Sequence, residues 1–216
     1  MADEKKSEKI IMVVEKNVLF GKDYFNGFRP QNGVDFKSRI LKNFQYDKRG
    51  NVENNPGYKQ PIGYCLIVNP RLKKVFAYQR ASQDSKYSEK RLQGKWSWGV
   101  GGHIEKIDEA ANPIHTSVLR ELKEEVPRDI LFKAIGGPRI LGYINDDSEP
   151  VGRVHFGVLY VLKTNSEKIV PNDPAIARCE FRTIKELEKI CSSPEVAVEG
   201  WSKIVLEPLK EYMTAL

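Results

Sequence analysis

The segment from Gly99 to Pro127, GVGGHIEKIDEAANPIHTSVLRELKEEVP, constrains the chain most, because it combines a glycine-rich turn, a helix start and a helix stop. Asn112 followed by Pro113 is typical of a helix N-terminus, since an asparagine side chain caps free N–H groups and proline fits the first helical position. Pro127 limits the helix at its other end, because the residue before a proline is pushed out of helical geometry. The segment therefore predicts one short helix after a turn.

This helix is expected to have an apolar face. The apolar side chains recur every fourth residue, at Ile114, Val118, Leu122 and Val126, with Leu119 beside them. Such a spacing places them in one stripe along a helix, which predicts that the stripe packs against a core.

The acids of the same helix lie next to that stripe. At about 100° per residue, Glu121, Glu124 and Glu125 share an arc roughly 100° wide. Like charges at this spacing repel and cost helix stability, which Arg120 offsets in part by reaching Glu124. A divalent cation offsets far more, because hard ions such as Mg²⁺ take oxygen ligands and bridge carboxylates to phosphates. The alternative is a solvated acidic face without chemical function.

The glycines before the helix add a second feature. Gly99, Gly101 and Gly102 follow residues 95–98, KWSW, which read as a strand end. Glycines at such a place let the backbone approach an anion or offer a carbonyl to a metal. A glycine pair alone is commonly just a turn, so its meaning depends on the acidic helix that follows.

Turn, helix and acid run together resemble the signature of the Nudix hydrolases, in which a glycine and a glutamate precede Arg-Glu-aliphatic-x-Glu-Glu-x-Gly. The tail of the pattern matches at Arg120, Glu121, Leu122, Lys123, Glu124 and Glu125, and its beginning at Gly101, Gly102 and Glu109. The intervals on either side of Glu109 are longer than in the family, and Pro127 stands in place of the last glycine.

The resemblance implies an α/β fold, a Nudix α/β/α sandwich with a mixed β-sheet flanked by helices, plus an N-terminal extension. It implies a hydrolase that cleaves a diphosphate linkage in a nucleoside diphosphate joined to another group, with Mg²⁺ or Mn²⁺ as cofactor. Expected catalytic residues are Glu121, Glu124, Glu125 and Arg120; expected metal ligands are the three glutamates and the Gly102 carbonyl; expected substrate contacts are Arg80, Gly101, Gly102 and His103.

Several assignments stay open at this point. The general base is a helix glutamate or an acid from a later loop, for which Asp146, Asp147, Glu149 and Asp173 are candidates. For Arg80 the alternative is a surface arginine, and for His103 a structural hydrogen-bonding residue. Two other functions also remain: chemistry like that of isopentenyl diphosphate isomerases, against which the lack of a cysteine between Cys65 and Cys179 argues, and a non-catalytic nucleotide-binding module.

Composition sets the broad class. With 216 residues, 40% of them hydrophobic and 30% charged, the chain is expected to fold as one substantial domain. No apolar run is long enough for a membrane span, the charged start lacks a signal peptide, and three scattered cysteines favour the cytoplasm. The net charge of +6 suits an anionic small molecule, whereas the spread of Lys and Arg gives no indication of nucleic acid.

The rest of the chain predicts a Nudix domain at residues 61–216 and an extension at 1–60, packed on the core as a lid or a surface for a homodimer. Strands are expected at residues 10–14, 62–68, 74–80, 139–144, 153–162 and 178–182. Beside the signature helix, further helices are expected at residues 35–46, 184–190 and from 193 onward, the last bent or split at Pro208. Trp96 and Trp98 are expected to pack rather than stack on a base.

Overall fold

The computed structural model describes residues 6–81, 93–167, 169 and 176–216. Contacts between Cα atoms divide the chain into two compact units. The first comprises Met1–Tyr64, Gly101–Arg120 and Ile140–Tyr160, and the second comprises Cys65–Val100, Glu121–Arg139 and Val161–Leu216. Five elements run from one unit into the other: β4 (Tyr58–Asn69), β7 (Gly99–His103), α5 (Pro113–Glu125), β8 (Arg139–Asn145) and β9 (His155–Lys163).

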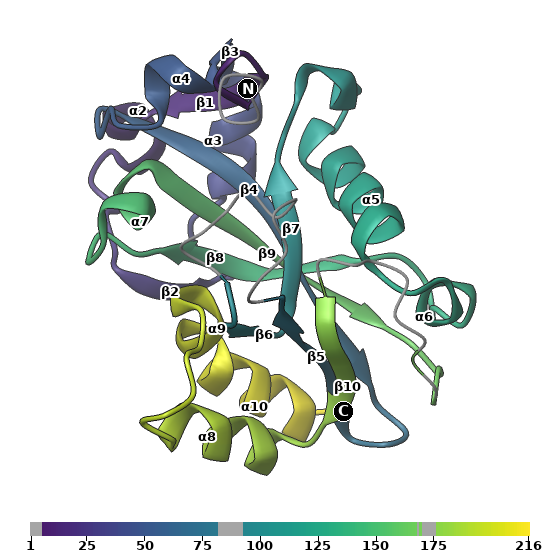
Figure 1. Ribbon diagram of the computed structural model, residues 1–216. Coiled ribbons are helices and arrows are strands. Elements are labelled where there is room, and N and C mark those ends of the chain that lie inside the picture. The colour runs from purple at the N-terminus through teal and green to yellow at the C-terminus, as the bar shows by residue number, and fades with distance from the viewer. Residues whose placement is uncertain (1–5, 82–92, 168, 170–175) are drawn as a thin grey trace. The chain divides into compact units, whose positions relative to one another are not determined.

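The first unit contains the strand order β4-β9-β8-β2, in which β2 pairs antiparallel with β8. β1 pairs antiparallel with β3 and, at its end, with β4. Figure 1 shows β1, β3 and α4 together near the N-terminus. Apart from the five shared elements, its elements are β1 (Ile10–Glu15), α2 (Lys16–Phe20), β2 (Gly27–Pro30), α3 (Phe36–Asn43), β3 (Gln45–Lys48), α4 (Arg49–Val52), the 3-10 helix η2 (Lys106–Asp108) and α7 (Pro150–Val154).

An aromatic cluster forms much of the core of the first unit. Phe36 is fully buried, and its ring lies 5.1 Å from that of Tyr143 and 5.5 Å from that of Phe156. Phe20 and Phe25 complete the cluster, with edge-on contacts to Phe156. Because aromatic rings of this kind bury large areas, the cluster joins α2, α3, β8 and β9. The aromatic residues Phe20, Phe25 and Phe36 of the opening third therefore serve the core.

The second unit contains the strand order β10-β5-β4-β9, with β6 also paired to β5. Three helices, α8, α9 and α10, lie together near the C-terminus, drawn in yellow and yellow-green in Figure 1. α8 begins with the expected capping box, in which Thr183 and Glu186 exchange side-chain and backbone hydrogen bonds. The elements are β5 (Lys74–Arg80), β6 (Trp96–Ser97), α6 (Arg128–Phe132), β10 (Ile176–Arg182), α8 (Ile184–Ser192), α9 (Gly200–Ile204) and α10 (Leu206–Thr214).

The fold class is confirmed: a mixed sheet with flanking helices. The glycine-rich turn expected before the signature helix is instead a strand: Gly99, Gly101 and Gly102 lie in β7, which pairs with β4. The helix expected at residues 35–46 ends at Asn43, and residues 45–48 form β3. Two other differences lie at the ends of elements. Residues 153–154 belong to α7 rather than to the following strand, and the last helical stretch begins at Gly200 rather than near residue 193. It breaks at Val205, before Pro208, because a proline cannot donate to the carbonyl four residues earlier. In the described part of the chain, no helix has the length and apolar character needed to cross a bilayer.

Candidate active site

The signature helix begins and ends where the sequence predicts. The Asn112 side chain accepts a hydrogen bond from the His115 N–H at 3.3 Å, and Pro113 is the first residue of α5. The helix ends at Glu125, two residues before Pro127. The four residues of the apolar stripe are buried, with exposed fractions of 3% or less, for Ile114, Val118, Leu122 and Val126. Leu119, beside the stripe, is 39% exposed.

All three signature glutamates lie on α5. Glu121 is 8% exposed, Glu125 is half-buried and Glu124 is exposed. Ionised carboxylates accept hydrogen bonds but cannot donate them. Their oxygens, at this helical spacing, are suitable ligands for a hard divalent cation. Among the described residues no three His, Cys, Asp or Glu side chains form a ready-made cation cage. Magnesium sites do not require one, because Mg²⁺ keeps waters and uses one or two carboxylates with substrate phosphates.

Arg120 is held by a buried carboxylate. Its Nε donates to Asp108 Oδ1 and its Nη2 to Asp108 Oδ2, both at 2.9 Å. The Asp108 side chain is only 2% exposed, and it also accepts from the Glu105 N–H at 2.9 Å. Such a two-point pair fixes orientation as well as energy. Nη2 also donates to the His103 carbonyl at 3.1 Å, so one guanidinium connects α5, η2 and the end of β7.

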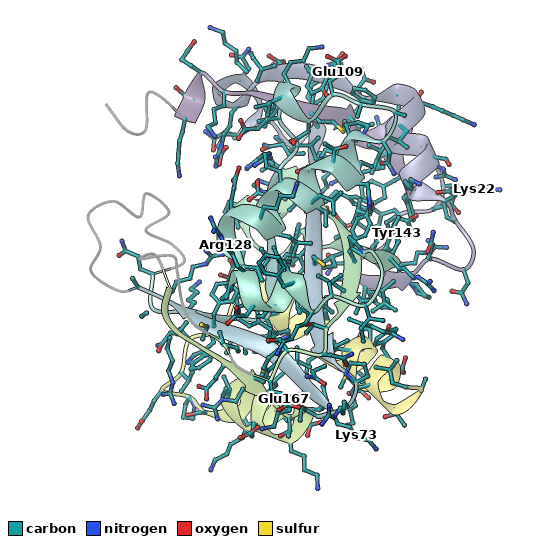
Figure 2. All side chains as sticks on the ribbon, turned by 90° about the vertical axis from the view of Figure 1, so that its right-hand side faces the viewer. Lys22, Lys73, Glu109, Arg128, Tyr143 and Glu167 are labelled. Carbon is teal, nitrogen blue, oxygen red and sulfur yellow. The ribbon has the colours of Figure 1, made fainter. Side chains whose placement is uncertain are left out.

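Glu109, which the family pattern assigns as the first acid, lies elsewhere. Its carboxylate pairs with Lys106 at 2.6 Å. The Glu109 side chain is more than half exposed, and Figure 2 shows it at the periphery. The acid that engages Arg120 is Asp108, one residue earlier. The sequence contains a signal for Asp108, because Glu105 and Asp108 have the spacing of a capping box, and this box begins η2.

The glycines of β7 lie close to the backbone of β4. A Cβ atom on Gly101 would lie 2.1 Å from the carbonyl oxygen of Gly63, so no other residue fits there. Gly63 in turn faces Val118 of α5, at 2.3 Å from an added Cβ. These two glycines bring β7, β4 and α5 together within the first unit.

His103 is the last residue of β7, and its side chain belongs to a polar network. Its Nε2 lies 2.7 Å from Gln60 Oε1 and 3.1 Å from His155 Nε2, while His155 Nδ1 lies 2.6 Å from the Val151 carbonyl. Burial, and then the neighbouring His155 and Arg49, hold the pKa of His103 well below its ordinary value of 6.5. The imidazole is thus neutral at physiological pH. These contacts agree with the structural alternative for His103, whereas no pattern in the sequence indicated a role for His155.

Arg80 is not a surface arginine. Its side chain is 12% exposed, and Nε donates to Glu199 Oε1 at 2.6 Å. Nη2 donates to the Tyr78 hydroxyl at 3.1 Å, and that hydroxyl donates to the Gly99 carbonyl at 2.9 Å. The surface alternative was therefore wrong, and a phosphate contact stays a prediction. Trp96 and Trp98 are 6% and 0% exposed, which confirms that they pack.

Two acids of the later loop, Asp147 and Asp146, already accept hydrogen bonds. Asp147 accepts from Lys59 at 2.6 Å, from Lys16 at 2.8 Å and from the Tyr24 hydroxyl at 3.0 Å. Burial raises the pKa of Asp147, but these hydrogen bonds outweigh it and the pKa is lowered. Asp146 accepts from Ser148, Glu149 precedes α7 as its N-cap residue, and Asp173 lies outside the described residues.

Comparison with known proteins points in one direction. No protein-family profile matches the chain. Protein YmaB of Bacillus subtilis (strain 168) is 31% identical over 214 residues, which cover 95% of this chain and 99% of YmaB. The crystal structure of Tm1382, described as a candidate Nudix hydrolase, has a TM-score of 0.75 at 25% identity, covering 94% of this chain and 100% of Tm1382. The Nudix domain of Shewanella oneidensis NrtR, complexed with ADP-ribose, shares the fold, with a TM-score of 0.50 at 15% identity over 72% of this chain and 88% of that domain.

Proposed function

Since the chain belongs to the Nudix hydrolase family, whose enzymes act on phosphoric anhydride bonds, we propose that it cleaves the diphosphate linkage of a nucleoside diphosphate joined to another group. Nudix hydrolases generally use divalent metals, and we propose Mg²⁺ or Mn²⁺ for this chain.

The observation that carries the proposal is the bridge made by Arg120. Its guanidinium holds Asp108 on one side and the His103 carbonyl on another. Arg120 directly precedes Glu121, the first of the three glutamates, in the sequence. Arg120 therefore joins the Arg-Glu start of the signature to His103, the last residue of β7.

The proposed metal ligands are Glu121, Glu124 and Glu125, as their oxygen chemistry suggests. A bound divalent cation there would neutralise phosphate charge and lower the pKa of a water molecule. The Gly102 carbonyl belongs to the other unit, and its part as a ligand stays a prediction. We place the general base among the helix glutamates, because Asp147 already accepts from three donors.

A nucleotide-derived substrate is the best-supported choice. The NrtR domain is complexed with ADP-ribose, and the net charge of +6 favours an anionic substrate. ADP-ribose therefore belongs in the first set of compounds, together with nucleoside triphosphates, dinucleoside polyphosphates and sugar nucleotides.

The test is a turnover screen of these compounds with Mg²⁺ and with Mn²⁺, following release of phosphate or nucleotide. Glu124→Gln and Glu125→Gln are expected to lower metal-dependent turnover by at least about 100-fold, because the metal supplies several kcal/mol of transition-state stabilisation. Glu211→Gln, an exposed glutamate on α10, is the matched control and should leave turnover unchanged. Full activity in both signature variants would refute the assignment.

Two alternatives gain nothing from the structure. Isomerase chemistry needs a reactive cysteine, whereas Cys65 is buried, and burial raises the pKa of its thiol. A non-catalytic binding module predicts ligand binding without turnover, an outcome that the screen detects. A cytoplasmic location, a homodimer and a lid role for residues 1–60 also stay proposals, and light scattering of the purified chain tests the dimer.

A further inference from the structure

A chain of hydrogen-bonded polar side chains, in which His103 is half-buried, meets the end of β7 within the first unit. It joins Gln60 of β4, His103 of β7 and His155 of β9. Gln60 is fully buried and His155 is 8% exposed. Polar groups with so little exposure form hydrogen bonds with one another, because a buried polar group without a partner costs stability.

Two backbone carbonyls determine the polarity of this network. The Val151 carbonyl can only accept, so His155 carries its proton on Nδ1 and presents a bare Nε2 when neutral. The Val52 carbonyl likewise accepts from Gln60 Nε2, which turns Gln60 Oε1 toward His103. Both groups that face His103 Nε2 are therefore acceptors, and His103 must carry its proton there and donate to both.

His103 is consequently held at both ends. Its ring is held by Gln60 and His155, and its carbonyl accepts from Arg120 Nη2 at 3.1 Å and from Ser117 Oγ at 3.5 Å. The residue before it is Gly102. Glycine has no side chain with which to restrict its own backbone. Gly101, Gly102 and His103 form the end of β7, which pairs with β4, so the contacts of His103 hold this end of the strand in addition to that pairing.

We propose that His155, acting through His103, is a positioning residue that fixes the Gly101–Gly102 segment of β7 for diphosphate hydrolysis. The inference rests on the proposed function, and it assigns His155 no contact with the substrate. Gln60 supplies the second acceptor of the same proton. The other charged groups that act electrostatically on the pair are Arg49, Lys59, Lys9, Lys6 and Glu53.

Two substitutions of His155 separate positioning from packing. His155→Gln reaches as far as the imidazole Nε2 and keeps an acceptor for His103, whereas His155→Asn reaches only as far as Nδ1 and keeps the donor to Val151. Loss of a supporting hydrogen bond of this kind typically costs 10- to 100-fold in activity. We expect His155→Asn to lower kcat/KM by about 10-fold or more, and His155→Gln to recover most of that loss.

The kinetic comparison uses ADP-ribose with Mn²⁺ or, if ADP-ribose is not cleaved, the diphosphate of the screen with the highest turnover. The folded fraction of each variant is measured by urea denaturation under assay conditions. His115→Gln, which removes an imidazole on α5 outside this network, is the control and should behave as the parent chain. Equal losses in the two His155 variants, in proportion to their folded fractions, would overturn the positioning role.

A second measurement does not depend on turnover. Nitrogen-15 NMR of the imidazoles should show a proton on Nε2 of His103 and on Nδ1 of His155. The amide signals of Gly101 and Gly102 should shift in His155→Asn and return toward their original positions in His155→Gln. A His103 protonated on Nδ1, or glycine signals that stay in place in His155→Asn, would refute the positioning role of His155. Absence of turnover in the parent chain would instead refute the proposed function.

Discussion

Acidification should destabilise the chain through its buried histidine pair. Burial, and then His155 and Arg49, keep the pKa of His103 well below 6.5. Burial also lowers the pKa of His155, although its hydrogen bond to Val151 and the nearby Glu53 oppose the shift. In the unfolded chain both imidazoles return to their ordinary value of 6.5. Below that pH the unfolded state binds more protons than the folded state, so the free energy of unfolding must fall.

The size of the effect follows from the two titrations. A histidine that stays neutral in the folded state loses about 1.4 kcal/mol of stabilisation between about pH 7.5 and about pH 5.5. If both imidazoles stay neutral, the pair loses about 2.7 kcal/mol over the same interval. Carboxylates with lowered pKa values, such as Asp35 and Glu186, have ordinary values of 3.8 and 4.5 and contribute mainly at lower pH.

Urea denaturation at these two pH values measures the effect. The double variant His103→Gln/His155→Gln should lose less stability on acidification than the parent chain, by about 2–3 kcal/mol, whatever its stability at neutral pH. His115→Gln is the control and should retain the full pH dependence of the pair. If the double variant and the parent chain lose the same free energy, the two imidazoles do not share the buried neutral state described above.

Two further predictions concern the signature. Asp108→Asn should lower the free energy of unfolding by about 2–3 kcal/mol, because it leaves Arg120 facing a neutral amide in a buried pair. Glu109→Gln should change it by less than about 0.5 kcal/mol, and equal effects of the two variants in thermal or urea denaturation would contradict the assignment of Asp108. Gly101→Ala should cost about 3 kcal/mol or more, since the added Cβ would meet a backbone carbonyl that cannot move aside; a near-normal melting temperature would disprove the close approach.

Local signals predicted much of the fold, because their physical causes act within a few residues. β5 has the predicted bounds, Lys74–Arg80, and the turn before it is closed by the Asn69 side chain, which accepts from the Leu72 N–H at 2.9 Å. Likewise, the capping pair Thr183–Glu186 begins α8 at the predicted residue. Both depend on interactions between residues three apart, which spacing in the sequence reveals directly.

Other boundaries depend on interactions that the pattern of apolar residues does not show. Residues 153–162 read as one strand, but α7 extends to Val154, and β9 begins at His155. The Lys59 side chain, fully buried, donates to the carbonyls of Gly152 and His155 at 3.0 and 3.2 Å. These bonds come from a residue about ninety positions earlier in the chain, so a local reading of hydrophobicity has no access to them.

The same distinction explains which parts of the candidate site were found. Glu121, Glu124 and Glu125 share one helix, so their spacing alone places them together. Asp108 meets Arg120 across an irregular segment, where counting residues against a family pattern selected the neighbouring Glu109. The geometry selects Asp108 because η2 buries that side chain and leaves Glu109 exposed.

His155 lies further beyond the reach of sequence. It is fifty-two residues from His103 in the chain and is found only when β4, β7 and β9 lie in position. A signature motif therefore identifies the groups proposed to bind metal, whereas the groups that hold them in place come from strands whose sequence shows only that they are buried. Substitutions at Asp108 and His155 test the fold's contribution to the site more directly than substitutions of the glutamates do.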